Sequence, residues 1–206
     1  MRRTYAMVGI ASAGLVTASL VMRAPASAKD TVNGSGGDDH LRGTPSSDTI
    51  RGFAGDDRVH ALAGADLIRG GSGFDVVFAG RGDDTIRGGI QQDLLISGQG
   101  DDATYGGAGR DRIGGNDAPG VLNSTGSDVI FGGAMADEIF DGGGADAIHG
   151  GLGNDTIRLQ KDGTPDTVTC GAGHDVVWGA TSGNSVAADC EEVHVQQQPQ
   201  RGPRLR

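Results

Sequence analysis

Aspartate recurs every ninth residue along most of the chain, and this spacing presents carboxylates to a common ligand. Dividing the sequence into nine-residue units from Gly34 places Asp at the sixth position of 15 units. Carboxylates are hard oxygen ligands for divalent cations, and so strict a phase exceeds what turn formation alone demands of Asp. The candidate metal ligands are Asp39, Asp48, Asp57, Asp66, Asp75, Asp84, Asp93, Asp102, Asp111, Asp128, Asp137, Asp146, Asp155, Asp166 and Asp175.

The positions around each aspartate are phased too. The fourth position is glycine in 11 of 15 units, and the eighth is aliphatic in all but one. Glycine permits backbone angles closed to other residues, so we expect a turn over positions one to six. Positions seven to nine then form a short strand whose eighth side chain points inward. The eighth positions are Leu41, Ile50, Val59, Ile68, Val77, Ile86, Leu95, Thr104, Ile113, Ile130, Ile139, Ile148, Ile157, Val168 and Val177.

Each unit is predicted to form half of a coil, so two units form a full turn that stacks on the next turn at about 4.8 Å. Asp57 then lies over Asp39, and Asp66 over Asp48. Such carboxylates repel by roughly 3–4 kcal/mol per pair at an effective dielectric constant near 20. A cation bound between the turns makes the electrostatic interaction favourable instead. Calcium takes about 6–8 oxygen ligands, whereas magnesium wants a tighter octahedron and zinc prefers Cys and His. We therefore predict multiple bound Ca²⁺ ions and a thin core that folds only with metal.

Units such as Gly70–Phe78 and Gly150–Arg158 carry the complete pattern G-G-x-G-x-D-x-U-x, with U aliphatic. Over about residues 34–178 the chain resembles RTX (repeats-in-toxin, hemolysin-type) calcium-binding nonapeptide repeat proteins. The resemblance implies an all-β fold: a right-handed parallel β-roll (RTX β-solenoid) with two repeats per coil and a C-terminal cap. Members with lipase, protease or toxin activity carry that chemistry outside their repeats, so the resemblance implies no catalytic residues here.

The first 28 residues differ in composition and predict a secretory signal peptide. A positively charged start precedes an apolar run over residues 6–22, and Ala26-Ser27-Ala28 supplies a cleavage site. The run is short for a membrane span, and an uncleaved anchor is the alternative. Cleavage before Lys29 leaves 14 basic against 27 acidic residues, which disfavours nucleic acid and anionic membranes as partners. The predicted domains are the signal peptide (1–28), the β-roll with its cap (29–195) and a disordered basic tail (196–206).

Two breaks interrupt the period. The first, between Asp111 and Asp128, leaves room for one weakened repeat at residues 115–123, and the second is a two-residue insertion near Leu159-Gln160. We interpret both as bulges or loops in one continuous coil, which ends in a degenerate unit at residues 179–187. Weak calcium sites are expected where the fourth position is not glycine, at Ser46, Gln91, Met135 and Thr164.

The two cysteines, Cys170 and Cys190, lie close to one coil apart in the sequence. An even cysteine count in an exported protein favours a disulfide over two free thiols. The segment Asp189–Val193 resembles the closing segment of small exported actinobacterial calcium-binding proteins. A cap at this place would cover the unpaired edges of the last strands.

No catalytic motif accompanies the repeats, and the five histidines are not grouped as ligands. One outer row offers cations and a ring to an acidic polysaccharide, or simply pairs with nearby acids; it contains Arg51, Arg69, Arg87 and Tyr105. The leading hypothesis is a secreted, non-enzymatic calcium-binding protein that folds on binding calcium between its turns. The alternatives are a calcium-dependent carbohydrate- or cell-surface-binding (adhesin-like) module and an enzyme with its active site on the solenoid face.

Overall fold

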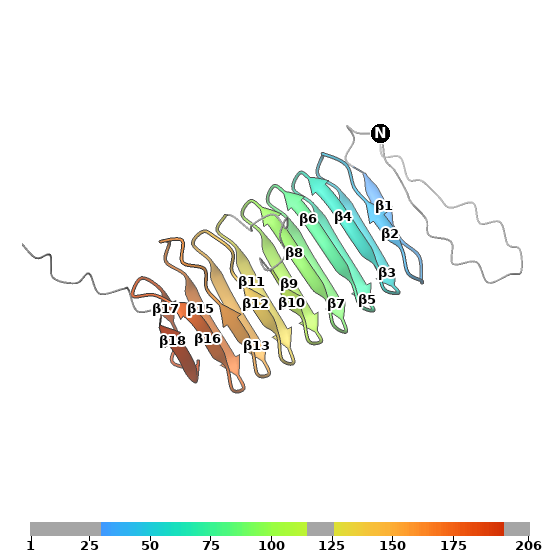
Figure 1. The fold of residues 1–206 in the computed structure, drawn as a ribbon. Coiled ribbons are helices and arrows are strands. Elements are labelled where there is room, and N and C mark those ends of the chain that lie inside the picture. Colours follow the sequence, from blue (N-terminus) through green and yellow to red (C-terminus); the bar gives the residue numbers. More distant parts are fainter. Residues whose placement is uncertain (1–29, 115–125, 196–206) are drawn as a thin grey trace, which may run out of the picture.

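The computed structural model describes residues 30–114 and 126–195. Within these ranges all regular structure is β, in two nine-stranded parallel sheets stacked along an elongated solenoid (Figure 1). Successive strands alternate between the sheets, so two strands and two turns make one coil. This confirms the predicted all-β parallel β-roll with two repeats per coil. The predicted signal peptide (1–28) and basic tail (196–206) lie outside the described residues.

The two sheets, named A and B here, contain the even-numbered and odd-numbered strands respectively. Sheet A consists of β2 (His40–Arg42), β4 (Arg58–Ala63), β6 (Val76–Arg81), β8 (Leu94–Gln99), β10 (Arg112–Ile113), β12 (Glu138–Phe140), β14 (Thr156–Arg158), β16 (Val176–Ala180) and β18 (Glu192–Val195). Sheet B consists of β1 (Thr31–Asn33), β3 (Thr49–Ala54), β5 (Leu67–Ser72), β7 (Thr85–Ile90), β9 (Ala103–Ala108), β11 (Val129–Ala134), β13 (Ala147–Leu152), β15 (Thr167–Ala172) and β17 (Ser185–Val186).

The longest strands extend further than the sequence pattern predicts. Strand β5 covers six residues, positions seven to nine of one unit and the first three of the next. Glycine permits this continuation at position two: Gly71 has a φ of 130°, and a Cβ atom there would collide with the carbonyl oxygen of Phe53 on the previous coil. The turn is confined to positions four to six, so the expectation of a turn over positions one to six is wrong in extent.

The core is narrow and consists of inward-pointing side chains from both sheets. Among the described residues, every eighth-position side chain from Val32 to Val177 is buried, including the polar Thr104. The first position of each unit also points inward, and on sheet A this row contains Ala61 and Ala79. The predicted arrangement of two facing aliphatic rows is confirmed, and the first positions add small residues beside them.

The two breaks in the period have different structural consequences. Strand β9 pairs directly with β11, and the backbone amide of Asp102 donates to Asp128, 26 residues away. The sheet A strand between β9 and β11 is β10, so the described strands form one continuous stack across this break. Residues 115–123, which are predicted to form a weakened repeat, lie outside the described residues. The two-residue insertion is confirmed, since the amide of Asp146 donates to Asp166 over 20 residues where regular coils span 18.

The C-terminal end of the roll is closed by a covalent bond and by acidic side chains. Cys170 and Cys190 form the expected disulfide, with their Cα atoms 5.1 Å apart. The carboxylate of Asp189 accepts hydrogen bonds from the backbone amides of Cys170 (3.3 Å) and Gly171 (3.1 Å). Strands β17 and β18 extend the two sheets here. Across residues 30–114 and 126–195, no helix has the length and apolar character needed to cross a membrane.

Candidate metal centre

The phased aspartates form two columns, each directly preceding the strands of one sheet. In both columns the backbone amide of an aspartate donates to Oδ1 of the aspartate on the next coil. Asp57 donates to Asp75 over 3.0 Å, and Asp66 donates to Asp84 over 2.8 Å. Column A, which precedes sheet A, contains Asp39, Asp57, Asp75, Asp93, Asp111, Asp137, Asp155 and Asp175. Column B contains Asp48, Asp66, Asp84, Asp102, Asp128, Asp146 and Asp166.

This geometry brings together all of the aspartates that the sequence pattern selects. Each of the 15 side chains is at most 3% exposed, and the alternation by two units is as predicted. The hydrogen bonds from the amides orient every carboxylate except that of Asp39 in the same way, by holding Oδ1 toward the preceding aspartate of the column. The second oxygen, Oδ2, is therefore held at an equivalent place in each turn.

The second carboxylate oxygen has no hydrogen-bond donor in most of the column. The phased aspartates whose buried Oδ2 lacks a partner are Asp57, Asp66, Asp75, Asp84, Asp93, Asp102, Asp111, Asp137, Asp146, Asp155 and Asp175. A buried polar atom without a partner is costly, and a buried charge is more so. A repeated orphan oxygen of this kind is the observation expected where a cation completes the structure.

Backbone carbonyl oxygens converge with these carboxylates beside the first glycine of the unit. A Cβ atom at Gly132 would lie 2.7 Å from Oδ2 of Asp137 and 2.5 Å from the carbonyl oxygen of Gly150. At Gly150 the corresponding distances are 2.6 Å to Asp155 Oδ2 and 2.5 Å to the carbonyl oxygen of Cys170. The missing side chain leaves a space bordered by one carboxylate oxygen and one carbonyl oxygen from adjacent coils. This all-oxygen donor set fits calcium.

Burial of the columns raises the pKa of their carboxyl groups. The pKa of Asp57 rises to about 6, that of Asp66 to about 7 and that of Asp93 to about 8. Desolvation is the largest cause, the backbone hydrogen bond opposes it, and the neighbouring aspartate of the column adds to it. Without a cation, a fraction of the column therefore holds protons near neutral pH, because ionising every member would leave like charges buried together.

Turns without glycine at the fourth position keep the same geometry in two cases. Gln91 and Met135 both adopt a φ of 81°, in the region that glycine normally occupies. Asp93 and Asp137, which follow them, retain an unpartnered Oδ2 like their neighbours. The lower affinity expected at these turns stays a prediction, although the strained backbone gives it a physical basis.

Three buried or capping acids escaped the sequence analysis. Asp30 begins column B by donating its amide to Asp48 Oδ1 (2.8 Å), and Glu191 ends column A by accepting from the amide of Asp175 (2.8 Å). The nine-residue phase extended upstream finds Asp30, with Val32 at the eighth position. Asp141 is buried but lies outside the phase, so only the folded structure reveals it.

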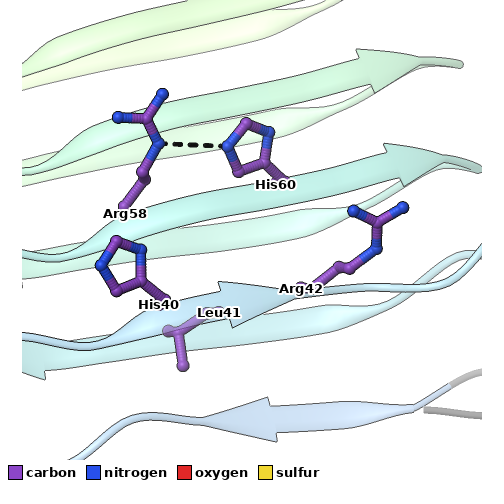
Figure 2. A pocket seen from close by; sticks show the side chains of 5 residues that line it. All are labelled: His40, Leu41, Arg42, Arg58 and His60. Carbon is purple, nitrogen blue, oxygen red and sulfur yellow. Dashed lines mark hydrogen bonds between the residues drawn. The ribbon is translucent and has the colours of Figure 1, made fainter. Parts of the chain in front are cut away.

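The histidines do not form a metal site with the aspartates in the part of the chain that the structure describes. His40 and His60 line a shallow depression on the outer face of sheet A together with Arg42 and Arg58 (Figure 2). Arg58 Nε donates to His60 Nε2 over 3.2 Å. Burial, followed by the charges of Arg58 and Arg42, lowers the pKa of His60. The adjacent guanidinium groups oppose a metal cation at this place.

Comparison with known proteins agrees with the geometry. The family model described as the RTX calcium-binding nonapeptide repeat (4 copies) matches residues 33–68, 60–95, 69–104, 78–113 and 123–157. No curated protein matches the chain. The matched ranges together cover more than half of the sequence and contain most of both aspartate columns.

Proposed function

Because the chain belongs to the family of RTX calcium-binding nonapeptide repeat proteins, whose repeats bind Ca²⁺, we propose that it is a secreted, non-enzymatic protein that folds on binding calcium between its coils. The unpartnered Oδ2 atoms of the aspartate columns carry this proposal. Bound calcium supplies positive charge to carboxylates that the chain itself leaves without donors.

The chain's own residues would hold the ion by carboxylate and backbone oxygens. Asp137 and Asp155 are examples in column A, each with its free Oδ2 beside a carbonyl oxygen of the following coil. In the folded roll, the amide of the preceding aspartate in the column donates to Oδ1 and fixes each of these carboxylates. Once the roll has formed, the carboxylates are already aligned, so binding an ion costs no further entropy for aligning them. Because this alignment exists only in the folded roll, calcium binding is linked to folding.

The narrow core supports coupled folding. Its large side chains are only the two rows of Leu, Ile and Val, and the turns between them are rich in glycine. Each ordered residue costs roughly 1–2 kcal/mol of backbone entropy, and a glycine costs more. Because calcium binds the folded chain and not the unfolded one, its free energy of binding adds directly to the free energy of unfolding.

Secretion is supported by the composition of residues 1–28 and by the disulfide. A disulfide between Cys170 and Cys190 suits an oxidising compartment. N-terminal sequencing of the chain recovered from culture medium should begin at Lys29. Recovery of an intact N-terminus from the cells alone would contradict export.

Far-ultraviolet circular dichroism with and without calcium tests the proposed function. The full-length mature chain should have a disordered spectrum in chelator and a β spectrum in calcium. Magnesium at equal ionic strength is the control, because it demands a tighter octahedron and dehydrates reluctantly. A β spectrum that survives complete chelation would overturn coupled folding.

A second candidate function rests on the outer face of sheet B. Arg51, Arg69 and Arg87 occupy one row in register on adjacent coils, and no carboxylate of the described residues pairs with them. The row continues as stacked rings, with Tyr105 5.1 Å from Phe131 and Phe131 4.6 Å from His149 between ring centroids. A flat row of cations and rings suits an acidic polysaccharide.

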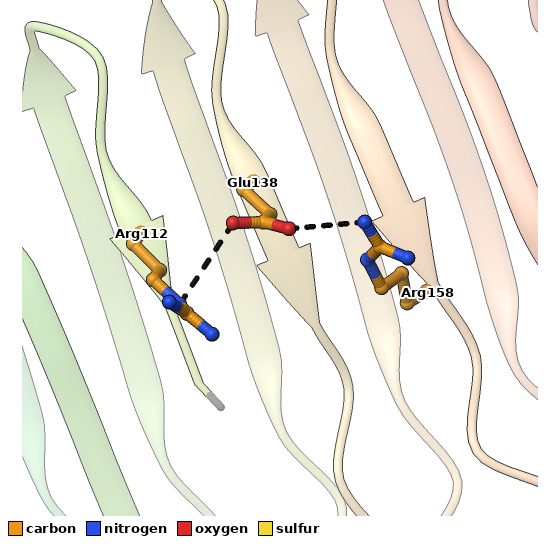
Figure 3. Close-up of polar contacts among 3 residues, drawn as sticks. All are labelled: Arg112, Glu138 and Arg158. Carbon is orange, nitrogen blue, oxygen red and sulfur yellow. Dashed lines mark hydrogen bonds and ion pairs between the residues drawn. The ribbon is translucent and has the colours of Figure 1, made fainter. Parts of the chain in front are cut away.

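On the outer face of sheet A, two of the cations share an acidic partner, whereas Arg42 and Arg58 lie beside histidines. Glu138 lies between Arg112 and Arg158, at 3.8 Å and 3.1 Å respectively (Figure 3). The arginines of sheet B differ from this pair because they stand in one row in register on three adjacent coils, in a protein whose net charge is −10. This contrast favours a calcium-dependent glycan- or cell-surface-binding role as the alternative function.

Retention on immobilised acidic polysaccharide in calcium tests this alternative. Replacing both Arg69 and Arg87 by Ala should abolish retention, whereas replacing Arg112 and Arg158 by Ala, on the opposite sheet, should preserve it. Unchanged retention after the first double substitution, or no retention of the parent protein, would eliminate the alternative and leave calcium-dependent folding untouched.

A further inference from the structure

A cluster of three buried carboxylates interrupts the regular architecture at the two-residue insertion. One carboxylate oxygen from each of Asp141, Asp146 and Asp166 lies within 4.8 Å of the other two. Their side chains are 2%, 3% and 2% exposed, respectively. Asp146 and Asp166 are successive members of column B, whereas Asp141 follows β12 and belongs to neither column.

Asp141 reaches the column because it occupies the inward first position of its unit. The equivalent residues of earlier coils on sheet A are small, namely Ala61 and Ala79. The Oδ2 side of each sixth-position carboxylate faces this first position, as the approach of Asp137 Oδ2 to Gly132 demonstrates. A carboxylate at position 141 therefore faces the Oδ2 atom of Asp146.

The inserted segment holds Asp141 in place. The backbone amide of Gln160 donates to both carboxylate oxygens of Asp141, at 2.8 Å and 3.0 Å. Gln160 belongs to the insertion that lengthens this coil. The insertion and the additional acid are therefore parts of one local structure, because the inserted amide orients the carboxylate that regular coils lack.

An independent observation indicates that the cluster is incomplete without a ligand. Oδ2 of Asp146 is buried and has no hydrogen-bond partner. No lysine or arginine within residues 30–114 and 126–195 forms an ion pair with any of the three carboxylates. Burial also raises the pKa of Asp141 to about 8 and that of Asp146 to about 7, with the neighbouring acids adding to the increase.

We propose that Asp141, Asp146 and Asp166 form a three-carboxylate cation site, in which Asp141 supplements two successive aspartates of column B, and that this site binds calcium most tightly. The inference rests on the proposed calcium-dependent folding. Regular turns bring together carboxylates of the column alone, whereas this turn adds a third negative charge and attracts a cation more strongly. The site therefore fills first as calcium rises, and it has the charge to accommodate a trivalent lanthanide.

Substitution of Asp141 by Ala in the full-length mature chain tests the proposal. Alanine occupies the equivalent position of two regular coils, at Ala61 and Ala79, so the fold accommodates this side chain. Calorimetric calcium titration and terbium luminescence should both lose their tightest step, with an affinity at least about tenfold weaker, while the other steps persist. Asp38→Ala, which removes an equal charge from an exposed position, should leave the tightest step unchanged.

The outcomes separate this inference from the proposed function. If the parent chain binds no calcium, both are wrong. If the parent chain binds several ions and Asp141→Ala retains the tightest step, only the three-carboxylate site is wrong. Asp141→Asn provides a second test if the alanine variant fails to fold, because it keeps an acceptor for Gln160 and removes only the charge. The same tenfold loss is expected there, and an unchanged tightest step would overturn the site.

Discussion

The middle coils and the outermost coils satisfy their buried aspartates in different ways. At most middle positions of both columns Oδ2 has no donor, as at Asp75 and Asp84. At Asp39, by contrast, Oδ2 accepts from the amide (2.5 Å) and hydroxyl (2.9 Å) of Ser35. Oδ2 of Asp48 similarly accepts from the backbone amide (2.6 Å) and the hydroxyl (2.9 Å) of Thr44.

The last coils follow the same rule with different donors. The side-chain amide of Asn184 donates to Oδ2 of Asp166 at the end of column B. The disulfide between Cys170 and Cys190 then fixes this end covalently. Asp30 at the start of column B and Asp175 at the end of column A, whose Oδ2 atoms are also unpartnered, are exceptions. The chain therefore supplies its own donors to Oδ2 of Asp39, Asp48 and Asp166, and it leaves most of the Oδ2 atoms between them to an external cation.

The largest contrast is expected between an aspartate of the middle and one near the end. Asp93→Asn should cost about 3–5 kcal/mol of unfolding free energy in saturating calcium, similar to breaking a buried ion pair. Asp39→Asn should cost about 1 kcal/mol, because protein donors already satisfy its carboxylate. Urea unfolding in excess calcium measures both, and equal losses would contradict the division into middle and end.

Removal of the disulfide should destabilise mainly the C-terminal end. Replacing both Cys170 and Cys190 by Ser should cost about 2–4 kcal/mol. Hydrogen exchange in calcium should lose protection in β15 to β18, while β5 to β8 keep theirs because their carboxylates still bind metal. The oxidised parent under the same conditions is the control. An equal loss of protection in both regions would show that the ends are not independently secured.

Acid should partly replace calcium in the middle coils. The folded pKa values of Asp57, Asp66 and Asp93, about 6, 7 and 8, lie above the unfolded value of about 3.9. The folded state therefore binds more protons, and its stability decreases as pH rises through these values. In chelator, the β signal at pH 5 should exceed that at pH 8.

The same linkage predicts that calcium affinity rises with pH. Protons and calcium compete for the columns, so the calcium concentration at half-folding should decrease between pH 6 and pH 8. Circular dichroism titrations across this range measure the effect. A half-folding concentration that is constant, or that increases with pH, would mean that the carboxyl groups are already ionised without metal.

The smallest effect is expected for a donor near the end of the roll. Thr44→Val removes the hydroxyl that donates to Asp48 Oδ2 and should cost about 1 kcal/mol. The cost should be the same at every saturating calcium concentration, because it reflects a protein hydrogen bond. Thr85→Val, on the outer face of sheet B, is the matched control and should be nearly neutral. A loss at Thr44 that depends on calcium would assign this turn to the metal-dependent group.

The sequence predicts the repeating part of the structure because one period fixes both pairing and burial. Asp57 and Asp75 are stacked as their spacing requires, and Ile50 and Ile68 point into the core. Features that depend on single departures from the period are harder to predict. Within residues 115–123, the apolar Leu122 stands where the pattern expects the eighth residue of a unit. The flanking strands β9 and β11 nevertheless pair directly with each other.

Asp141 shows most clearly what a pattern cannot reveal. Its position in the sequence is the first of a unit, where the pattern calls only for a small residue, so an acid there reads as an irregularity. Its approach to Asp146 and Asp166 depends on the inserted Gln160 amide, whose position emerges only when the coil is closed. The sequence does not predict the unpartnered Oδ2 atoms either. The spacing of the aspartates predicts where a carboxylate lies, but not which hydrogen-bond donors reach each of its oxygens.

Equilibrium dialysis of the mature chain against calcium tests the central claim most directly, because it counts ions held by the folded roll. We expect several calcium ions to be bound per chain in buffer, and we expect them to be lost together when urea unfolds the coils. A chain that keeps its β spectrum while dialysis recovers no bound calcium would contradict this expectation.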